Sequence, residues 1–433
     1  MAEQWDRAPM AQAEVVEPRH TGAFIALLDS DDPVSAIADM HRTTGVRAAE
    51  HVRGRDVADA MQMLDQGVSV LLDEIGVALL VPDQDQRSAV REAATRVSGV
   101  IAVEPERTVR ALQDTVSVDF LRGYRTAVDQ LVSSALHEQP AVGQVTAAPL
   151  ADESRSTWGL QAVRALESPF SGLDVRVCVL DTGVDTAHPD LAARIAKTES
   201  FIPGQIGDGH GHGTHCTGTA FGPRDPQVLP RYGVAHGAEV FVGKVLDDAG
   251  SGSDRGILAG INWAVTEGCR VVSMSLGAPA RVGERFSRVY EAVARRAMQR
   301  GTLIVAAAGN DSDRPRTISP VSHPANCPSI LAVAALDPDL EVARFSCGGL
   351  NPDGGQVDIA APGVDVLSSW PQDSYRRLSG TSMATPHVAG VVAMLAEAHP
   401  QAGPADLWQM LVVSARRLAL PARDVGAGLV QAP

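Results

Sequence analysis

The N-terminal part of the chain alternates short apolar runs with amphipathic helical patterns. Residues 23–28, AFIALL, predict a strand, and residues 31–42, DDPVSAIADMHR, predict a helix with an acidic cap and an early proline. The run VALLV at 77–81 predicts a second strand, residues 85–97 a second helix, and residues 99–112 a third extended segment. This order of elements predicts a small α+β domain with a split βαβ plan.

After Trp158 the pattern changes to short, almost wholly apolar runs that alternate with amphipathic segments. Helices are expected at residues 256–268 and 288–300. Apolar strands between helices are typical of a mostly parallel sheet covered by helices on both faces, and such sheets carry their chemistry at the carboxyl ends of the strands. The buried strands are expected at residues 175–180, 239–246, 270–276, 302–308 and 329–336.

A helical pattern and a linker separate these two regions. Residues 114–139 place apolar side chains on one stripe, although Gly123 weakens the helix by about 1 kcal/mol. Residues 140–156 are small, polar and proline-bearing, as linkers are. The pattern therefore divides the chain into a disordered leader at 1–21, an α+β domain at 22–111, a helix and linker at 112–156, and a second domain at 157–433.

The composition is that of an ordinary globular protein. Among 433 residues, 37 Lys and Arg stand against 52 Asp and Glu, a formal net charge of −15, so nucleic acid and anionic membranes are poor candidate partners. The N-terminus lacks the apolar run of a secretory signal, and no later run approaches the roughly 20 residues of a membrane span. As written, the sequence predicts a cytoplasmic protein, or a secreted one if the true start lies upstream. The five cysteines have no CxxC spacing, and we expect most to be buried thiols.

The stretch DGHGHGTHC at 208–216 concentrates residues that bind metals or carry protons. It places His210, His212, His215 and Cys216 within seven positions. Such a cluster fits the zinc site of a metallohydrolase, which would need further ligands. It also fits a segment in which one histidine is a catalytic base. The spacing alone leaves both interpretations open.

Three other segments place polar residues where strands end or helices begin. Asp181 follows a predicted central strand, which is a functional position in a parallel sheet, although Asp-Thr-Gly is also good turn chemistry. Ser382 begins a predicted helix with Pro386 in its first turn, and it is either a helix cap or a serine beside N–H groups that stabilise an oxyanion. Asn310 follows Gly309 after a strand, and it is either a turn residue or an amide donor.

The segments LDTGVD, GHGTHCTG, AAAGN and GTSMATPHVAG, in that order, closely resemble the subtilisin-like serine proteases. The resemblance covers about residues 155–433, and the segments THC and KVLDD lean toward the proteinase K branch. It implies an α/β fold with a subtilisin-like parallel sheet. It also implies a serine endopeptidase that acts on proteins or peptides and requires no cofactor for its chemistry. We expect a monomer.

The resemblance assigns a role to each motif residue. It makes Asp181 the orienting carboxylate and His212 the general base. Ser382 becomes the nucleophile, and Asn310 with the Ser382 backbone N–H becomes the oxyanion hole. A serine hydroxyl is a poor nucleophile until a base takes its proton, and a buried carboxylate stabilises the imidazolium that forms. The substrate would pair by strand addition with the matching family segment. The substrate-binding residues are Ser275, Leu276, Gly277 and Gly309.

Residues 22–111 resemble, more loosely, the inhibitory propeptide of the same family. This resemblance implies a zymogen whose propeptide end occupies the substrate cleft in cis and is cut by the enzyme itself. An unrelated small α+β domain is the alternative. In the family the mature domain usually begins at a segment like TWGLQAVRA, but here residues 112–156 intervene, so the resemblance does not locate the cleavage site.

The calcium sites of the family carry over only in part. The loop after the catalytic histidine helix lacks the asparagine-rich run of the strong site, which leaves Asp190 without obvious partners. Asp358 and the carbonyls of Pro328 and Ile330 match the positions of a weaker, proteinase K-like structural calcium site, and oxygen ligands of this kind suit Ca²⁺. An aspartate that merely ends a strand is the equal alternative.

Two other functions stay open at this level. A metallohydrolase built on His210, His212 and His215 would explain the histidine cluster, but it gives Ser382 and Asn310 no role. A catalytically silent member of the same family would serve as a binding protein. The presence of all four catalytic residue types disfavours this second alternative.

Overall fold

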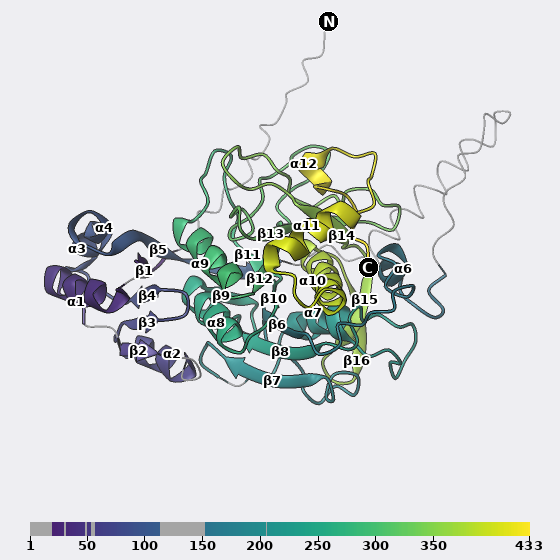
Figure 1. Cartoon of the computed structure of the whole chain (residues 1–433), viewed down its shortest axis with the longest axis horizontal. Coiled ribbons are helices and arrows are strands. Elements are labelled where there is room, and N and C mark those ends of the chain that lie inside the picture. The colour runs from purple at the N-terminus through teal and green to yellow at the C-terminus, as the bar shows by residue number, and fades with distance from the viewer. Residues whose placement is uncertain (1–19, 30–31, 48–49, 53–56, 113–151, 205) are drawn as a thin grey trace, which may run out of the picture.

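The computed structural model describes residues 20–433 except 30–31, 48–49, 53–56, 113–151 and 205. The predicted helix at 114–139, the predicted leader up to residue 19 and the predicted linker up to residue 151 lie outside these residues. The described chain forms two units in contact, which we call the N-terminal unit, residues 20–112, and the main unit, residues 152–433 (Figure 1).

A seven-stranded sheet in the order β14-β13-β12-β10-β6-β8-β7 is the centre of the main unit. Every neighbouring pair of its strands is parallel. The central strands are mainly apolar because both faces are covered, and β12 is apolar and buried at every position. The predicted parallel α/β sheet is confirmed. Its strands are β6 (Arg176–Asp181), β7 (Ile195–Ser200), β8 (Glu239–Lys244), β10 (Val271–Met274), β12 (Leu303–Ala307), β13 (Leu331–Leu336) and β14 (Ile359–Pro362).

Helices cover this sheet on both faces. Helices α8 and α9 lie in two crossovers that run in the same direction along the sheet, so right-handed connections place both on one face. Helices α7 and α10 pack against each other on the opposite face, where Gly390 of α10 lies against Ala220 of α7. The elements outside the sheet are α6 (Trp158–Ala162), α7 (His212–Phe221), α8 (Asp254–Thr266), α9 (Arg288–Gln299), α10 (Thr381–Ala398), α11 (Pro404–Ser414), α12 (Ala422–Val425) and the hairpin of β15 (Val366–Trp370) and β16 (Ser374–Leu378).

The N-terminal unit has a split βαβ arrangement. Strand β4 lies between β1 and β3 and is antiparallel to both, so β1 and β3 run parallel with one strand between them. Strand β5 pairs with the other side of β1. The elements are β1 (His20–Leu28), α1 (Pro33–Thr44), β2 (Glu50–Val52), α2 (Val57–Asp65), β3 (Val70–Leu72), β4 (Val77–Leu80), α3 (Arg87–Arg91), α4 (Ala93–Arg96) and β5 (Val100–Ala111).

The sheet of the N-terminal unit buries apolar side chains on both faces. Phe24 and Leu28 pack with the unit's own helices, whereas Ile25 and Leu27 belong to the apolar core of the main unit. Successive strand residues point to opposite faces, so this alternation places the sheet between its own helices and the main unit. Figure 1 shows the N-terminal unit, in purple and blue, beside α8 and α9, and β1 and β5 both contact α9.

The helix predicted at 85–97 is instead two short helices, α3 and α4. They are separated at Glu92, whose backbone N–H still bonds the carbonyl of Ser88. Val90 and Ala93 are both buried, as the apolar periodicity predicted. The pattern therefore indicated the buried face correctly and the continuity of the helix wrongly.

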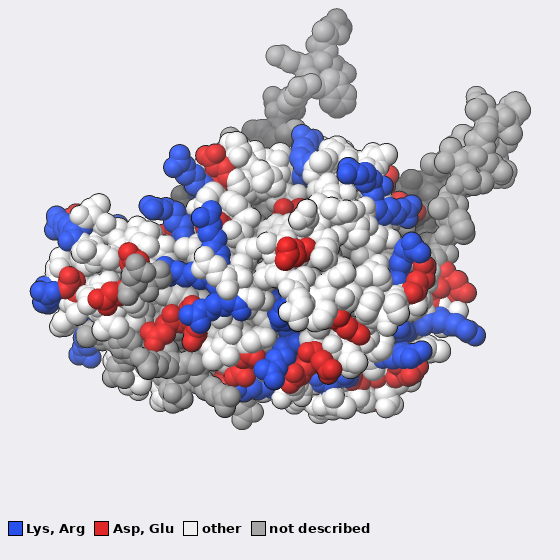
Figure 2. Space-filling model, viewed as in Figure 1, with Lys and Arg blue, Asp and Glu red and all other residues white. Residues whose placement is uncertain are grey.

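The charges in view are mixed in sign, and the cysteines are buried thiols, as the sequence predicted for most of them. Figure 2 shows Lys and Arg interspersed with Asp and Glu on the face in view. The five cysteines are all buried and unpaired with one another as disulfides. In the part of the chain that the structure describes, no helix combines the length and apolarity needed to span a membrane.

Candidate active site

The ends of two elements bring Asp181 and His212 together. Asp181 is the last residue of β6, and His212 is the first residue of α7. The Nδ1 atom of His212 lies 2.7 Å from Oδ1 of Asp181, and both side chains are fully buried. The same Asp181 oxygen also accepts the backbone N–H of Thr182. These contacts fix the imidazole with Nδ1 as the donor and leave its buried Nε2 atom without a protein partner.

The surroundings of His212 favour its protonated form. Burial is the largest single effect and disfavours the imidazolium, but the interactions with its neighbours, led by the carboxylate of Asp181, together raise the pKa of His212 well above its ordinary value. Cys216 contributes in the same direction, and its Sγ atom lies 3.8 Å from Nδ1 of His212. The imidazole is therefore a strong proton acceptor held in one orientation.

Ser382 lies at the second position of α10, where backbone N–H groups have no partner within the helix. Its Oγ atom donates to the carbonyl of Ser275 at 2.9 Å rather than to His212. Catalytic hydrogen bonds are often formed only with substrate in place, and a proton transfer from this hydroxyl to Nε2 of His212 would require the hydroxyl to turn. The helix start supplies a positive environment for negative charge beside this hydroxyl.

The side chain of Asn310 has a fixed orientation. Its Oδ1 atom accepts the backbone N–H of Thr381 at 2.9 Å and the Thr381 hydroxyl at 2.8 Å. Its Nδ2 atom is buried without a protein partner. The preceding Gly309 has φ of 110°, and a Cβ there would meet Oγ of Ser322 at 2.1 Å, so the backbone approach requires glycine. The result is an amide donor free to bind an oxygen beside Ser382.

A strand of the N-terminal unit occupies the cleft beside these groups. The predicted substrate segment contains β11 (Leu276–Gly277), and it pairs antiparallel with the end of β5. A second wall, β9 (Ser251–Ser253), pairs antiparallel with the other edge of β5. Sequence reasoning identified the first wall and missed the second, although the glycine and serine content of GSGS at 250–253 is typical of a backbone that pairs closely with another strand.

The structure does not bring the four residues of the histidine cluster together. His215 lies in α7 with Nε2 at 3.0 Å from the carbonyls of Val366 and Arg376, and burial lowers its pKa to about 3. The ring of His210 lies 6.0 Å from the ring of His212. Among the described residues, the one group of three metal-ligand types with its ligand atoms mutually close comprises Asp181, His212 and Cys216.

Asp208, in the same stretch, has a structural role that sequence reasoning missed. Its carboxylate accepts the hydroxyls of Thr182 and Thr214 and the backbone N–H of Gly211. These bonds join the end of β6 to the start of α7, and they fix the loop from which His212 projects.

Hydrogen-bond donors from the protein surround Asp190, the residue that the sequence left without obvious partners for calcium binding. Its carboxylate accepts the hydroxyl of Tyr232 at 2.7 Å, the hydroxyl of Tyr375 at 2.8 Å and the backbone N–H of Gln227. Tyr232 and Tyr375 come from segments far away in the chain, so local sequence could not reveal them. Protein donors satisfy this carboxylate, which agrees with the absence of the strong-site ligand run in the sequence.

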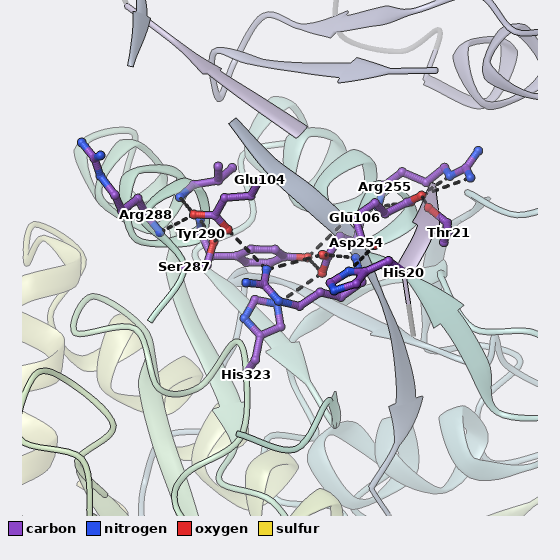
Figure 3. A network of polar contacts seen from close by, with 12 residues as sticks. His20, Thr21, Glu104, Glu106, Asp254, Arg255, Ser287, Arg288, Tyr290 and His323 are labelled. Atoms are coloured by element: carbon purple, nitrogen blue, oxygen red, sulfur yellow. Dashed lines mark hydrogen bonds and ion pairs between the residues drawn. The ribbon is translucent and has the colours of Figure 1, made fainter. Parts of the chain in front are cut away.

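A polar network joins β5 to the starts of two helices beyond the cleft (Figure 3). Glu104 accepts the hydroxyl of Ser287 at 2.6 Å and the backbone N–H of Arg288 at 2.8 Å, at the start of α9. The backbone N–H of Arg107 donates to Asp254, the first residue of α8, at 2.8 Å. Asp254 in turn contacts Tyr290 and His323, and Glu106 pairs with Arg255.

A buried Asp–His pair and a serine at a helix start, on a parallel sheet, are typical of a serine hydrolase. A model of the subtilase family matches residues 172–428. The chain is 35% identical over 289 residues to subtilisin E of Bacillus subtilis (strain 168), which covers 65% of this chain and 72% of that protein. It is 35% identical over 323 residues to an alkaline protease of Alkalihalobacillus alcalophilus, with 72% and 80% covered. Over 248 residues it is 40% identical to subtilisin Savinase of Lederbergia lenta, with 56% and 85% covered.

The chain therefore belongs to the subtilase family. It is a subtilisin-like serine endopeptidase and acts on protein or peptide substrates.

Proposed function

We propose that peptide bonds are hydrolysed through an acyl-enzyme formed at Ser382. His212 takes the hydroxyl proton through Nε2, and Asp181 holds the imidazole and stabilises the imidazolium. Asn310 Nδ2 and the backbone N–H of Ser382 bind the oxyanion of the tetrahedral intermediate. The orientation of His212 by Asp181, with Nε2 left free, is the observation on which the assignment chiefly depends.

We also propose that the chain is made as a zymogen and that residues 22–111 are its propeptide. The end of β5 fills the cleft between β9 and β11 as an antiparallel strand, which is the position of an extended substrate. Ile25 and Leu27 bury apolar surface against the main unit, and Glu104 binds the start of α9. These contacts support a propeptide that blocks the cleft until it is cut and released.

A structural calcium ion is the remaining part of the proposal. Asp358 directly precedes β14 and Ile330 directly precedes β13, so both residues lie at the amino ends of two neighbouring parallel strands. Burial raises the pKa of Asp358 to about 7, and its carboxylate accepts the backbone N–H of Ala332 at 2.8 Å. With the carbonyls of Pro328 and Ile330, which the family resemblance matches, this buried carboxylate would supply oxygen ligands for a cation. The ion would stabilise the fold and take no part in hydrolysis.

Replacing the nucleophile tests the proposed chemistry. Ser382→Ala should abolish hydrolysis of peptide substrates and leave the full-length chain uncut, because no acyl-enzyme can form. Peptidase assays and gel analysis of the purified variant beside the wild type measure both effects. A variant that still processes itself would show that another group is the nucleophile. A wild-type chain that stays whole and inactive would instead favour a silent binding protein.

A further inference from the structure

We propose that the first bond cleaved is the one between Leu112 and Gln113, so that residues 113–151 stay attached to the active enzyme. The proposal rests on the self-processing serine peptidase described above and adds the position of the cut. Cleavage there differs from a cut near residue 156, where the mature domains of relatives usually begin.

The register of β5 fixes which residue reaches the reacting groups. Arg110 lies opposite Gly277 on one wall and Ser251 on the other. The backbone N–H of Ala111 donates to the carbonyl of Gly250 at 2.9 Å. The next residue along the strand is Leu112, so the two walls hold the chain in extended form up to that position.

One carbonyl joins Leu112 to the proposed nucleophile. The oxygen of Ser275 accepts the backbone N–H of Leu112 at 3.3 Å and the hydroxyl of Ser382 at 2.9 Å. Two donors that share an acceptor at these distances lie close to each other. The carbonyl carbon of Leu112 belongs to the same residue as that N–H, so the bond that follows it is the one presented to Ser382.

The side chain of Leu112 packs against the wall of the cleft. Leu112 is buried, and its Cδ1 atom lies 3.2 Å from the position a Cβ would take at Gly277. Val109 is also buried, whereas Arg110 between them is exposed. The strand thus presents apolar residues to the enzyme and turns its one charged residue near the cut outward.

The segment near residue 156 is built into the main unit instead of the cleft. The backbone N–H of Thr157 donates to the carbonyl of Arg231 at 2.9 Å, and Ser156 forms a parallel bridge with Arg231. Trp158 is buried and its Nε1 donates to the carbonyl of Val364 at 3.1 Å. A cut at this place would first require these bonds to break.

Hydrolysis of the bond after Leu112 needs no co-reactant other than water. Ser382 Oγ bonds to the Leu112 carbonyl carbon and its proton passes to His212. The carbon–nitrogen bond to Gln113 then breaks, and the leaving nitrogen takes that proton from His212. Water hydrolyses the ester, which yields a carboxylate on Leu112 and restores the serine hydroxyl.

Intact-mass measurement with N-terminal sequencing, on full-length chain sampled from the earliest stage of processing, tests the position. The expected first products are a fragment that ends at Leu112 and one that begins at Gln113, with Ser382→Ala uncut. An earliest fragment that begins at Thr157 or at any other residue overturns the proposed bond while leaving the peptidase assignment intact. A Ser382→Ala chain that cuts itself would contradict the peptidase assignment instead.

A matched pair of variants tests the role of the Leu112 side chain. Leu112→Asp should slow the first cut by about 100-fold or more, because it buries an unpaired carboxylate, whereas Leu112→Met should keep it within about threefold. The same two changes in the Ser382→Ala chain, followed by thermal unfolding, show that both variants fold. Processing of a folded Leu112→Asp chain at the wild-type rate would overturn the assignment of Leu112 to the cleft.

Discussion

The two ends of the Asn310 amide lie in different surroundings, and this difference allows a sharp test. Oδ1 is held by Thr381, while Nδ2 has no protein partner. We expect Asn310→Ala to lower kcat on a peptide substrate by about 10² to 10³ with little change in KM, since the donor acts on the transition state. Asn310→Asp keeps the acceptor and loses the donor, so a similar loss is expected. A loss below about fivefold in both variants would remove Asn310 from the oxyanion hole.

The raised pKa of His212 predicts the acid side of the pH–rate profile. Only neutral imidazole accepts the serine proton, so activity falls as pH drops through the His212 pKa, and this fall begins above the pH expected for an ordinary histidine. Asp181→Asn removes the main cause of the rise, so the acid limb should move to lower pH while the maximum rate drops by about 10⁴-fold. Rates of self-cleavage measured across pH report both changes. An acid limb that stays in place in Asp181→Asn would contradict the assigned pairing.

At the scale of elements, the start of α9 depends on a carboxylate from the other unit. Glu104 accepts the N–H groups of Arg288 and Val289 and the hydroxyl of Ser287. Removing its charge in Glu104→Gln should weaken docking of the cleaved propeptide by about 1 kcal/mol, since charge at a helix start contributes that order of free energy. The lag between the first cut and full peptidase activity should shorten accordingly. Glu92→Gln, which removes an equal charge from the pair with Arg96, is the control, and an equal effect of both would contradict a specific role for Glu104.

The proposed calcium site at Asp358, beside β13 and β14, predicts that calcium changes the stability of the folded chain. The pKa of Asp358 is raised to about 7, so without a cation the folded state loses stability as pH rises from the ordinary carboxyl range, near 4, to about 7. Calcium should reverse this loss by binding the charged form. Thermal unfolding of the Ser382→Ala chain at pH 8, with calcium or with a chelator, measures the effect. Adding Asp358→Asn to this chain should remove the response, and a calcium response that survives the change would place the ion elsewhere.

At the scale of the whole molecule, sequence predicted what is local and missed what depends on distant pairing. The central strands were visible as apolar runs because they are buried on both faces, and the motif around His212 was visible because its residues are contiguous. The partners of Asp190, which are Tyr232 and Tyr375, are far away in the chain, as is the wall at β9. The break of the helix at Glu92 involves no change in the apolar pattern, so periodicity could not reveal it.

The arrangement of the two units also depends on contacts between residues far apart in the chain, so the sequence did not predict it. The apolar runs of the sequence predicted the strands of the N-terminal sheet. They did not predict that Ile25 and Leu27 pack against the core of the main unit. The register of β5 between β9 and β11 depends on pairs that lie far apart in the chain, and it is this register that places Leu112 beside Ser382.

Labelling of the processed enzyme by a serine-directed phosphonofluoridate, in the presence of a metal chelator, tests the central claim most directly. Mass spectrometry of the digested protein should find one phosphonyl group per chain, on Ser382, and peptidase activity should fall in proportion to the label. The chelator alone should leave hydrolysis intact. An enzyme that is fully active while carrying the label on Ser382, or one that is silenced by the chelator and never labelled there, would contradict catalysis by Ser382 with His212 as its base.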